Sequence, residues 1–122
     1  MAKEILKNIL YVQNSVRLYH WSTKSYARHV SSGDLYSNLD KLFDRFIETY
    51  QGWKGMWIMS AASPTPSINL SFGPISDQKI IEIVEDFREF LAILNDLPMD
   101  LENIRDEILG ELNRVLFLFT LN

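Results

Sequence analysis

The 122-residue chain contains no cysteine, which excludes a disulfide framework and a thiolate metal site. No run of residues is apolar enough for a membrane span, and the glycine-rich motifs of the common nucleotide-binding proteins do not occur. No segment is rich in lysine or arginine and the net charge is −4, so we do not expect a sequence-independent DNA-binding protein. The simplest expectation is a cytoplasmic protein without a signal peptide and without membrane contact.

Apolar residues, by contrast, are plentiful. They make up 47% of the chain, and they include seven phenylalanines, five tyrosines and three tryptophans. A chain of this length forms one domain, here residues 1–122, and this composition is enough to build a core for it. The many aromatic side chains indicate a bulky core or a buried subunit interface.

Apolar residues recur at three- and four-residue steps, which is typical of amphipathic helices. We expect four helices, over about 2–21, 26–59, 76–95 and 100–121. The second has an alternative start near Ser32, because Ser31 and Asp34 match a capping box. The predicted core positions are Ile5, Ile9, Val12, Val16, Tyr19, Leu39, Leu42, Phe43, Phe46, Tyr50, Trp53, Trp57, Ile80, Val84, Phe87, Leu91, Leu94, Leu101, Ile104, Ile108, Leu112, Val115 and Phe119.

The connections between these helices predict the topology. Residues 60–76 hold three of the four prolines and are long for a bundle connection, so we expect them to cross the bundle from end to end. Residues 97–99 form a short link, which makes the third and fourth helices antiparallel neighbours. The chain is therefore predicted to be an all-α four-helix bundle with a long crossover. Its apolar last turns, 115–119, indicate a subunit contact.

Two histidines and a run of carboxylates are the candidates for chemistry. His20 and His29 flank the first turn, and Asp40, Asp44 and Glu48 follow at four-residue steps that place them on one helix face. Imidazole and carboxylate together suit iron, zinc or manganese. The alternative is a solvated acidic face, paired with Lys41 and Arg45, and two histidines without a ligand role.

The spacing of these residues resembles the Dps family, the mini-ferritins. The resemblance rests on the pair His20-Trp21, on His29, on Asp44 fifteen residues later and on Glu48 four residues after that. The apolar, aromatic finish of the last helix is similar too. Residues 20–29 resemble still more closely the short ferritin-like proteins that tailed phages often encode.

The resemblance implies a ferritin-like bundle with a ferroxidase site between two subunits. His20 and His29 of one chain would face Asp44 and Glu48 of a two-fold partner, and these four would be the metal and catalytic residues. Trp21 would lie beside the bound iron. The implied function is oxidation of Fe(II) by peroxide or oxygen, with Fe(III) stored in a homo-oligomeric shell of up to twelve subunits.

Two other functions stay open. The chain could be an interaction protein on the same bundle, encoded by a phage and acting on a host component without redox activity, in which case the acidic run is a solvated surface. Zinc or manganese could also bind to the same residues as a structural metal.

Overall fold

The structure, a computed structural model, describes residues 1–61, 65–70 and 73–121. In these ranges it contains four α-helices, one short 3₁₀ helix and no strand, which confirms the predicted all-α class. The elements are α1 (Ala2–Ser22), α2 (Tyr26–Lys54), η1 (Ile58–Ala61), α3 (Asp77–Ala92) and α4 (Met99–Leu118). No helix in the described part of the chain combines the length and apolar character needed to cross a bilayer.

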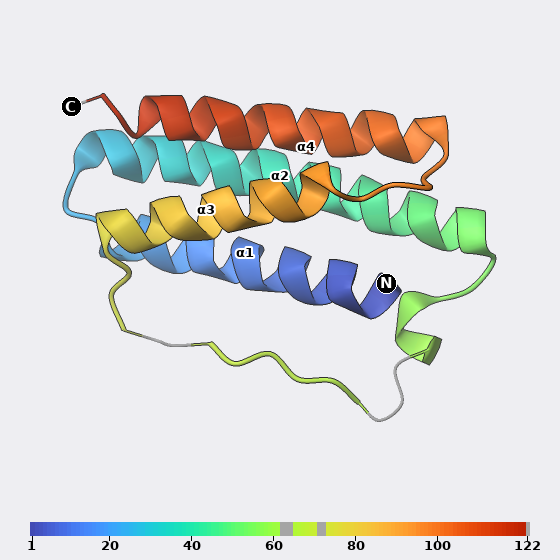
Figure 1. Cartoon of the computed structure of the whole chain (residues 1–122). Coiled ribbons are helices and arrows are strands. Elements are labelled where there is room, and N and C mark those ends of the chain that lie inside the picture. The colour runs from blue at the N-terminus through green and yellow to red at the C-terminus, as the bar shows by residue number, and fades with distance from the viewer. Residues whose placement is uncertain (62–64, 71–72, 122) are drawn as a thin grey trace.

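The four α-helices form a closed bundle. Helix α1 packs against α2 and α3, and α4 packs against the same two helices on the other side. Figure 1 shows that α2 and α3 run in the same direction, because η1 lies at one end of the bundle and α3 begins at the other, with residues 65–70 placed along the side of the bundle between them. The predicted end-to-end crossover and the antiparallel α3–α4 pair are therefore confirmed.

The two ends of this bundle differ and are named here. The turn end holds the α1–α2 turn, the start of α3 and the end of α4, whereas the loop end holds the end of α2, η1 and the α3–α4 link (Figure 1). A single apolar core runs between them, built from the predicted helical stripes. Two predicted core residues are not in it: Trp53 and Trp57 are exposed at the loop end.

Local signals decide where α2 begins and ends. The Ser25 hydroxyl accepts a hydrogen bond from the backbone N–H of Arg28, a serine N-cap that starts the helix at Tyr26. The alternative start near Ser32 is therefore wrong, and Ser32 is buried inside the helix. At the other end, Gly55 adopts a φ of 67°, the left-handed conformation that ends helices. The predicted continuation to Met59 is wrong for this reason.

A polar cluster ties all four helices together at the turn end. The Tyr19 hydroxyl of α1 donates to Asp77 of α3 at 2.6 Å. Arg28 of α2 donates to the Tyr19 oxygen at 3.1 Å and to the carbonyl of Phe119, just past α4, at 2.6 Å. Its guanidinium also lies 4.8 Å from the centre of the Phe119 ring. We call these four residues the turn-end clamp, because they fix the ends of α1 and α4 and the starts of α2 and α3.

Candidate functional site: the α1–α2 seam

The two histidines meet across the α1–α2 turn. Their rings stack with centroids 3.9 Å apart and planes inclined by 14°. The Nδ1 of His20 lies 2.7 Å from the carbonyl oxygen of His29, and the Nδ1 of His29 lies 2.9 Å from the carbonyl oxygen of His20. A carbonyl only accepts, so each Nδ1–H donates. His29 thereby satisfies one of the free carbonyls in the last turn of α1. We call this reciprocal pair the histidine clasp.

A glycine on α2 leaves room for the clasp. A Cβ atom placed on Gly33 would lie 2.8 Å from Cε1 of His20, closer than a non-bonded contact allows. Gly33 is in the interior of a helix, where glycine costs about 1 kcal/mol relative to alanine. Its presence is explained by the approach of the His20 ring and not by the backbone conformation.

Next to the clasp, Arg17 of α1 stacks on aromatic rings. Its guanidinium carbon lies 3.7 Å from the centre of the Tyr36 ring and 5.2 Å from that of Trp21. Tyr36 is half-buried and Trp21 is 67% exposed. Among the described residues Arg17 forms no hydrogen bond and no ion pair. Stacking uses the face of a guanidinium and leaves its N–H edge available.

One turn before Arg17 on α1, Gln13 also contacts α2. Its Nε2 donates to the carbonyl of Tyr36 at 3.4 Å and to the Asp40 carboxylate at 3.3 Å. The contacts of α1 with α2 thus form one row along the outside of the bundle. We call this row the α1–α2 seam; its residues are Gln13, Arg17, His20, Trp21, His29, Gly33, Tyr36 and Asp40.

The charge of the chain is unevenly distributed around the seam. Residues 1–30 contain five Lys and Arg side chains and one carboxylate. Residues 31–122 contain seven Lys and Arg side chains and fifteen carboxylates. An acidic protein therefore carries a basic first helix and turn. The only carboxylate of α1 is Glu4, thirteen residues before Arg17.

The predicted carboxylates lie elsewhere on α2. Asp44 and Glu48 are exposed and interact with each other, and the hydrogen bond and charge of Asp44 raise the pKa of the Glu48 carboxyl. Asp44 follows His29 by fifteen residues of continuous helix, which places it about 22 Å further along the axis. In the described residues no three His, Asp or Glu side chains come together as a metal site. One chain thus brings the histidines together but keeps them from the carboxylates.

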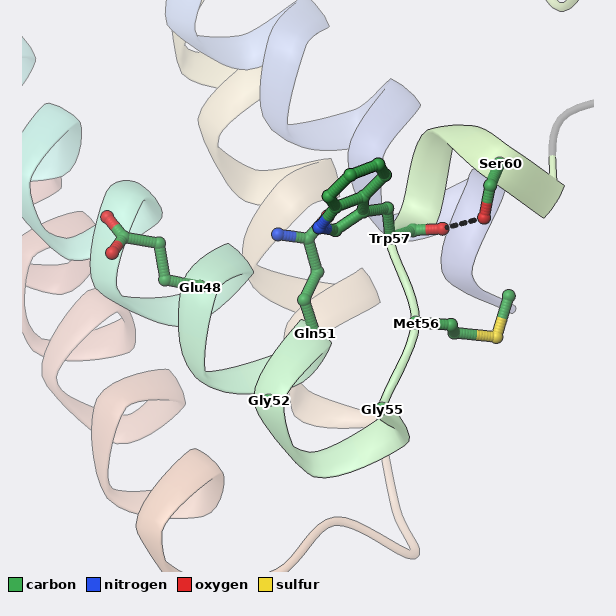
Figure 2. A pocket seen from close by; sticks show the side chains of 7 residues that line it. All are labelled: Glu48, Gln51, Gly52, Gly55, Met56, Trp57 and Ser60. Atoms are coloured by element: carbon green, nitrogen blue, oxygen red, sulfur yellow. Dashed lines mark hydrogen bonds between the residues drawn. The ribbon is translucent and has the colours of Figure 1, made fainter.

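Glu48 instead borders an open depression at the loop end. This depression of about 540 Å³ is lined by Glu48, Gln51, Gly52, Gly55, Met56, Trp57 and Ser60. Figure 2 shows Glu48 and Met56 on opposite sides of it. Gln51 accepts a hydrogen bond from the backbone N–H of Ile58 at 3.0 Å, which ties η1 to α2. Glu48 is the one charged residue of the lining, and the polar side chains of Gln51 and Ser60 already hydrogen-bond to the backbone of η1 and of Trp57.

Sequence reasoning missed Arg17 and Tyr36. A signal for Arg17 was present, since Arg17 and Trp21 are four residues apart and so share a helix face. The excess of cations in residues 1–30 was a second signal. No sequence signal pointed to its partner Tyr36, because the position of Tyr36 opposite Arg17 depends on how α1 and α2 pack.

Comparison with known proteins places the chain in a family. Residues 20–119 match the model of DUF5856, a family of unknown function, so the chain belongs to that family. A relative in Enterobacteria phage T4, described as an uncharacterized 14.6 kDa protein in the mobD-ri intergenic region, is 31% identical over 121 residues. That match covers 98% of this chain and 88% of the relative. No solved structure matches the chain.

These findings overturn the Dps resemblance. The family is DUF5856 and not Dps or another ferritin family, so the assignment to Dps is wrong, and iron binding, ferroxidase activity and iron storage lose the resemblance from which they were drawn. The nine-residue step from His20 to His29 stacks the two rings against each other, so within one chain the histidines pair with each other and not with Asp44 or Glu48. A site shared by His20, His29, Asp44 and Glu48 of two subunits stays a prediction that a single chain does not test.

Proposed function

We propose that this chain is a phage-encoded interaction protein, which acts by binding a protein of the infected host cell and not by redox turnover. The surface that we assign to this binding is the turn-end part of the α1–α2 seam together with Tyr26. The T4 relative supports the phage setting, and an interaction role accounts for the features of this surface that a storage protein does not need.

The observation that carries the proposal is the display of two large aromatic side chains on a fixed turn. Trp21 is 67% exposed and Tyr26 is 80% exposed, one on each side of the three-residue turn 23–25. The turn-end clamp and the histidine clasp hold the helices that carry them. Exposed Trp and Tyr side chains are the residues most often found at the energetic centres of interfaces. Rigid display also lowers the entropy cost of binding.

A site-specific photocrosslinking experiment tests the proposal. A photoreactive phenylalanine is placed at Lys24, which is exposed between the two aromatic residues, and at Ile93, which is exposed at the loop end as the matched control. Irradiation of phage-infected cells should give an adduct with a second polypeptide from position 24 and not from position 93.

The aromatic residues supply the second arm of this test. The double variant Trp21→Ala/Tyr26→Ala should reduce the adduct at position 24 at least about fivefold, since both proposed anchors are gone. Equal adducts from positions 24 and 93, or an adduct that the double variant forms as well as the wild type, would contradict the proposed surface. An adduct of twice the chain's own mass would show that the partner is a second copy.

A further inference from the structure

Within the seam, Arg17 has the geometry of an anion-binding residue. Its guanidinium lies against Tyr36 and near Trp21, and this contact fixes the plane of the group. Asp40, the carboxylate of the seam, is bound by the side-chain amide of Gln13. A planar, oriented fork of N–H donors matches a carboxylate, which it binds through two parallel hydrogen bonds.

We infer that the α1–α2 seam binds an acidic segment of a partner protein, with Arg17 holding a carboxylate of that segment and Trp21 covering the neighbouring side chain. This inference rests on the proposed function and names the chemistry of the partner. Arg28 is engaged in the turn-end clamp, but the other four Lys and Arg side chains of residues 1–30, against one carboxylate, provide complementary charge that attracts an acidic segment.

The same charge distribution argues against a nucleic acid at this site. Arg17 could bind a phosphate and Trp21 could stack on a base. A nucleic acid, however, needs a basic surface that extends over several phosphates, and residues 31–122 carry fifteen carboxylates and seven Lys and Arg side chains. A short acidic peptide needs only the seam.

Tryptophan fluorescence tests the inference directly. Trp53 and Trp57 are exposed, so a Trp53→Phe/Trp57→Phe background should keep the fold, and it leaves Trp21 as the only tryptophan, which excitation selective for indole reports. The probe is a capped hexaglutamate peptide, with capped hexaglutamine as the neutral match and oligo-dT as the phosphate match. We expect hexaglutamate to change the Trp21 emission saturably, hexaglutamine and oligo-dT to leave it unchanged, and added salt to weaken the effect.

Two substitutions at Arg17 separate geometry from charge. Arg17→Gln should weaken hexaglutamate binding about tenfold or more, and Arg17→Lys should lose most of the affinity as well, because an ammonium lacks the planar fork. Arg114→Gln, on exposed α4 surface outside the seam, removes the same charge and should change the affinity less than about twofold. Circular dichroism checks that each variant remains helical.

Several results would overturn the inference. These are the absence of hexaglutamate binding at millimolar peptide, tighter binding of oligo-dT, equal losses in Arg17→Gln and Arg114→Gln, or full binding by Arg17→Lys. A wild type that dimerises in sedimentation while Arg17→Gln stays monomeric would assign the seam to a second copy and would also overturn it. If the crosslink from Lys24 persists unchanged in Arg17→Gln, the interaction surface stands and the role of Arg17 is refuted.

Discussion

The two ends of the bundle both expose aromatic side chains, but they hold them in different ways. At the turn end, the single side chain of Arg28 bonds both to α1 and to the residue that follows α4. The exposed Trp21 and Tyr26 therefore stand on helices whose ends are fixed. At the loop end, Trp57 is 75% exposed and precedes a four-residue 3₁₀ helix that Gln51 ties to α2 through one hydrogen bond. Because long-range polar contacts are concentrated at the turn end, we expect that end to hold its exposed aromatic side chains more rigidly than the loop end does.

Among substitutions that test this comparison, Arg28→Met should change the free energy of unfolding the most. The guanidinium is mostly buried and makes charge-assisted hydrogen bonds to Tyr19 and to the Phe119 carbonyl, so its loss should lower the free energy of unfolding by about 2 to 3 kcal/mol. Urea denaturation followed by circular dichroism measures this loss in the free energy of unfolding. Arg114→Met, on exposed surface, should stay within about 0.5 kcal/mol of the wild type. Equal losses in the two variants would refute the turn-end clamp.

Gly33→Ala should have the next largest effect. The added methyl displaces the His20 ring, and overpacking of this kind costs about 1 to 3 kcal/mol, against a gain of about 1 kcal/mol in helix propensity. We expect a net loss of roughly 1 kcal/mol in the free energy of unfolding. The matched control is Gly110→Ala in α4, where no atom lies within 4 Å of the new methyl, and it should stabilise the protein.

A His20→Ala background separates the effect of the histidine clasp from the effect of helix propensity at Gly33. When His20 is already alanine, Gly33→Ala should become stabilising by up to about 1 kcal/mol, since the methyl then meets no ring. A Gly33→Ala effect that keeps its sign in the His20→Ala background would show that the clasp does not explain the glycine.

Tyr19 makes the turn end sensitive to alkaline pH. Burial, then the hydrogen bond to Asp77, raises the pKa of the Tyr19 phenol above its ordinary value. The folded state therefore favours the neutral phenol, and this contribution is complete below the unfolded pKa of about 10 and is lost as the pH rises through the higher folded pKa. Urea unfolding at pH 9 and pH 11 should show that the advantage of the wild type over Tyr19→Phe shrinks. A difference that is constant with pH would contradict this.

The smallest expected effect is a change in the pKa of Glu48, which borders the depression at the loop end. Asp44→Asn removes the charge and hydrogen bond that raise the pKa of Glu48, so this pKa should fall toward the ordinary glutamate value, as carboxyl ¹³C shifts during an NMR titration would show. Asp34→Asn is the control, because Asp34 lies fourteen residues from Glu48 on the same helix. If both variants lower the pKa equally, the Asp44–Glu48 pair is not the cause.

Much of the fold could be predicted from the sequence because helix periodicity is a local signal. The core stripes and the crossover followed from spacing and proline content, and the first helix was predicted within one residue of its observed end. The start of α2 was open between Tyr26 and the capping box near Ser32, and the N-cap of Ser25 together with the burial of Ser32 against α1 decides for Tyr26. The exposure of Trp57 could not be predicted from its apolar character; Gly55 was the available signal that α2 had already ended.

The candidate site was less predictable because its contacts cross between helices. The spacing of His20 and His29 placed both beside one turn, but the same spacing also fits two ligands of a shared metal site. Only the relative placement of α1 and α2 shows that each Nδ1 binds the other residue's carbonyl. Arg17 was missed because its partner Tyr36 is nineteen residues away, beyond the reach of a helical pattern.

The uneven charge of the chain has a consequence for the kinetics of association. A basic first helix and turn and an acidic remainder separate positive from negative charge along the chain, and the field of such a distribution acts on an approaching charged partner before any atoms touch. We expect this field to orient the protein during the diffusional encounter, so that the seam faces an acidic partner in a larger share of collisions. The rate of arrival then depends on ionic strength, while the lifetime of the complex depends on the short-range contacts of the aromatic side chains.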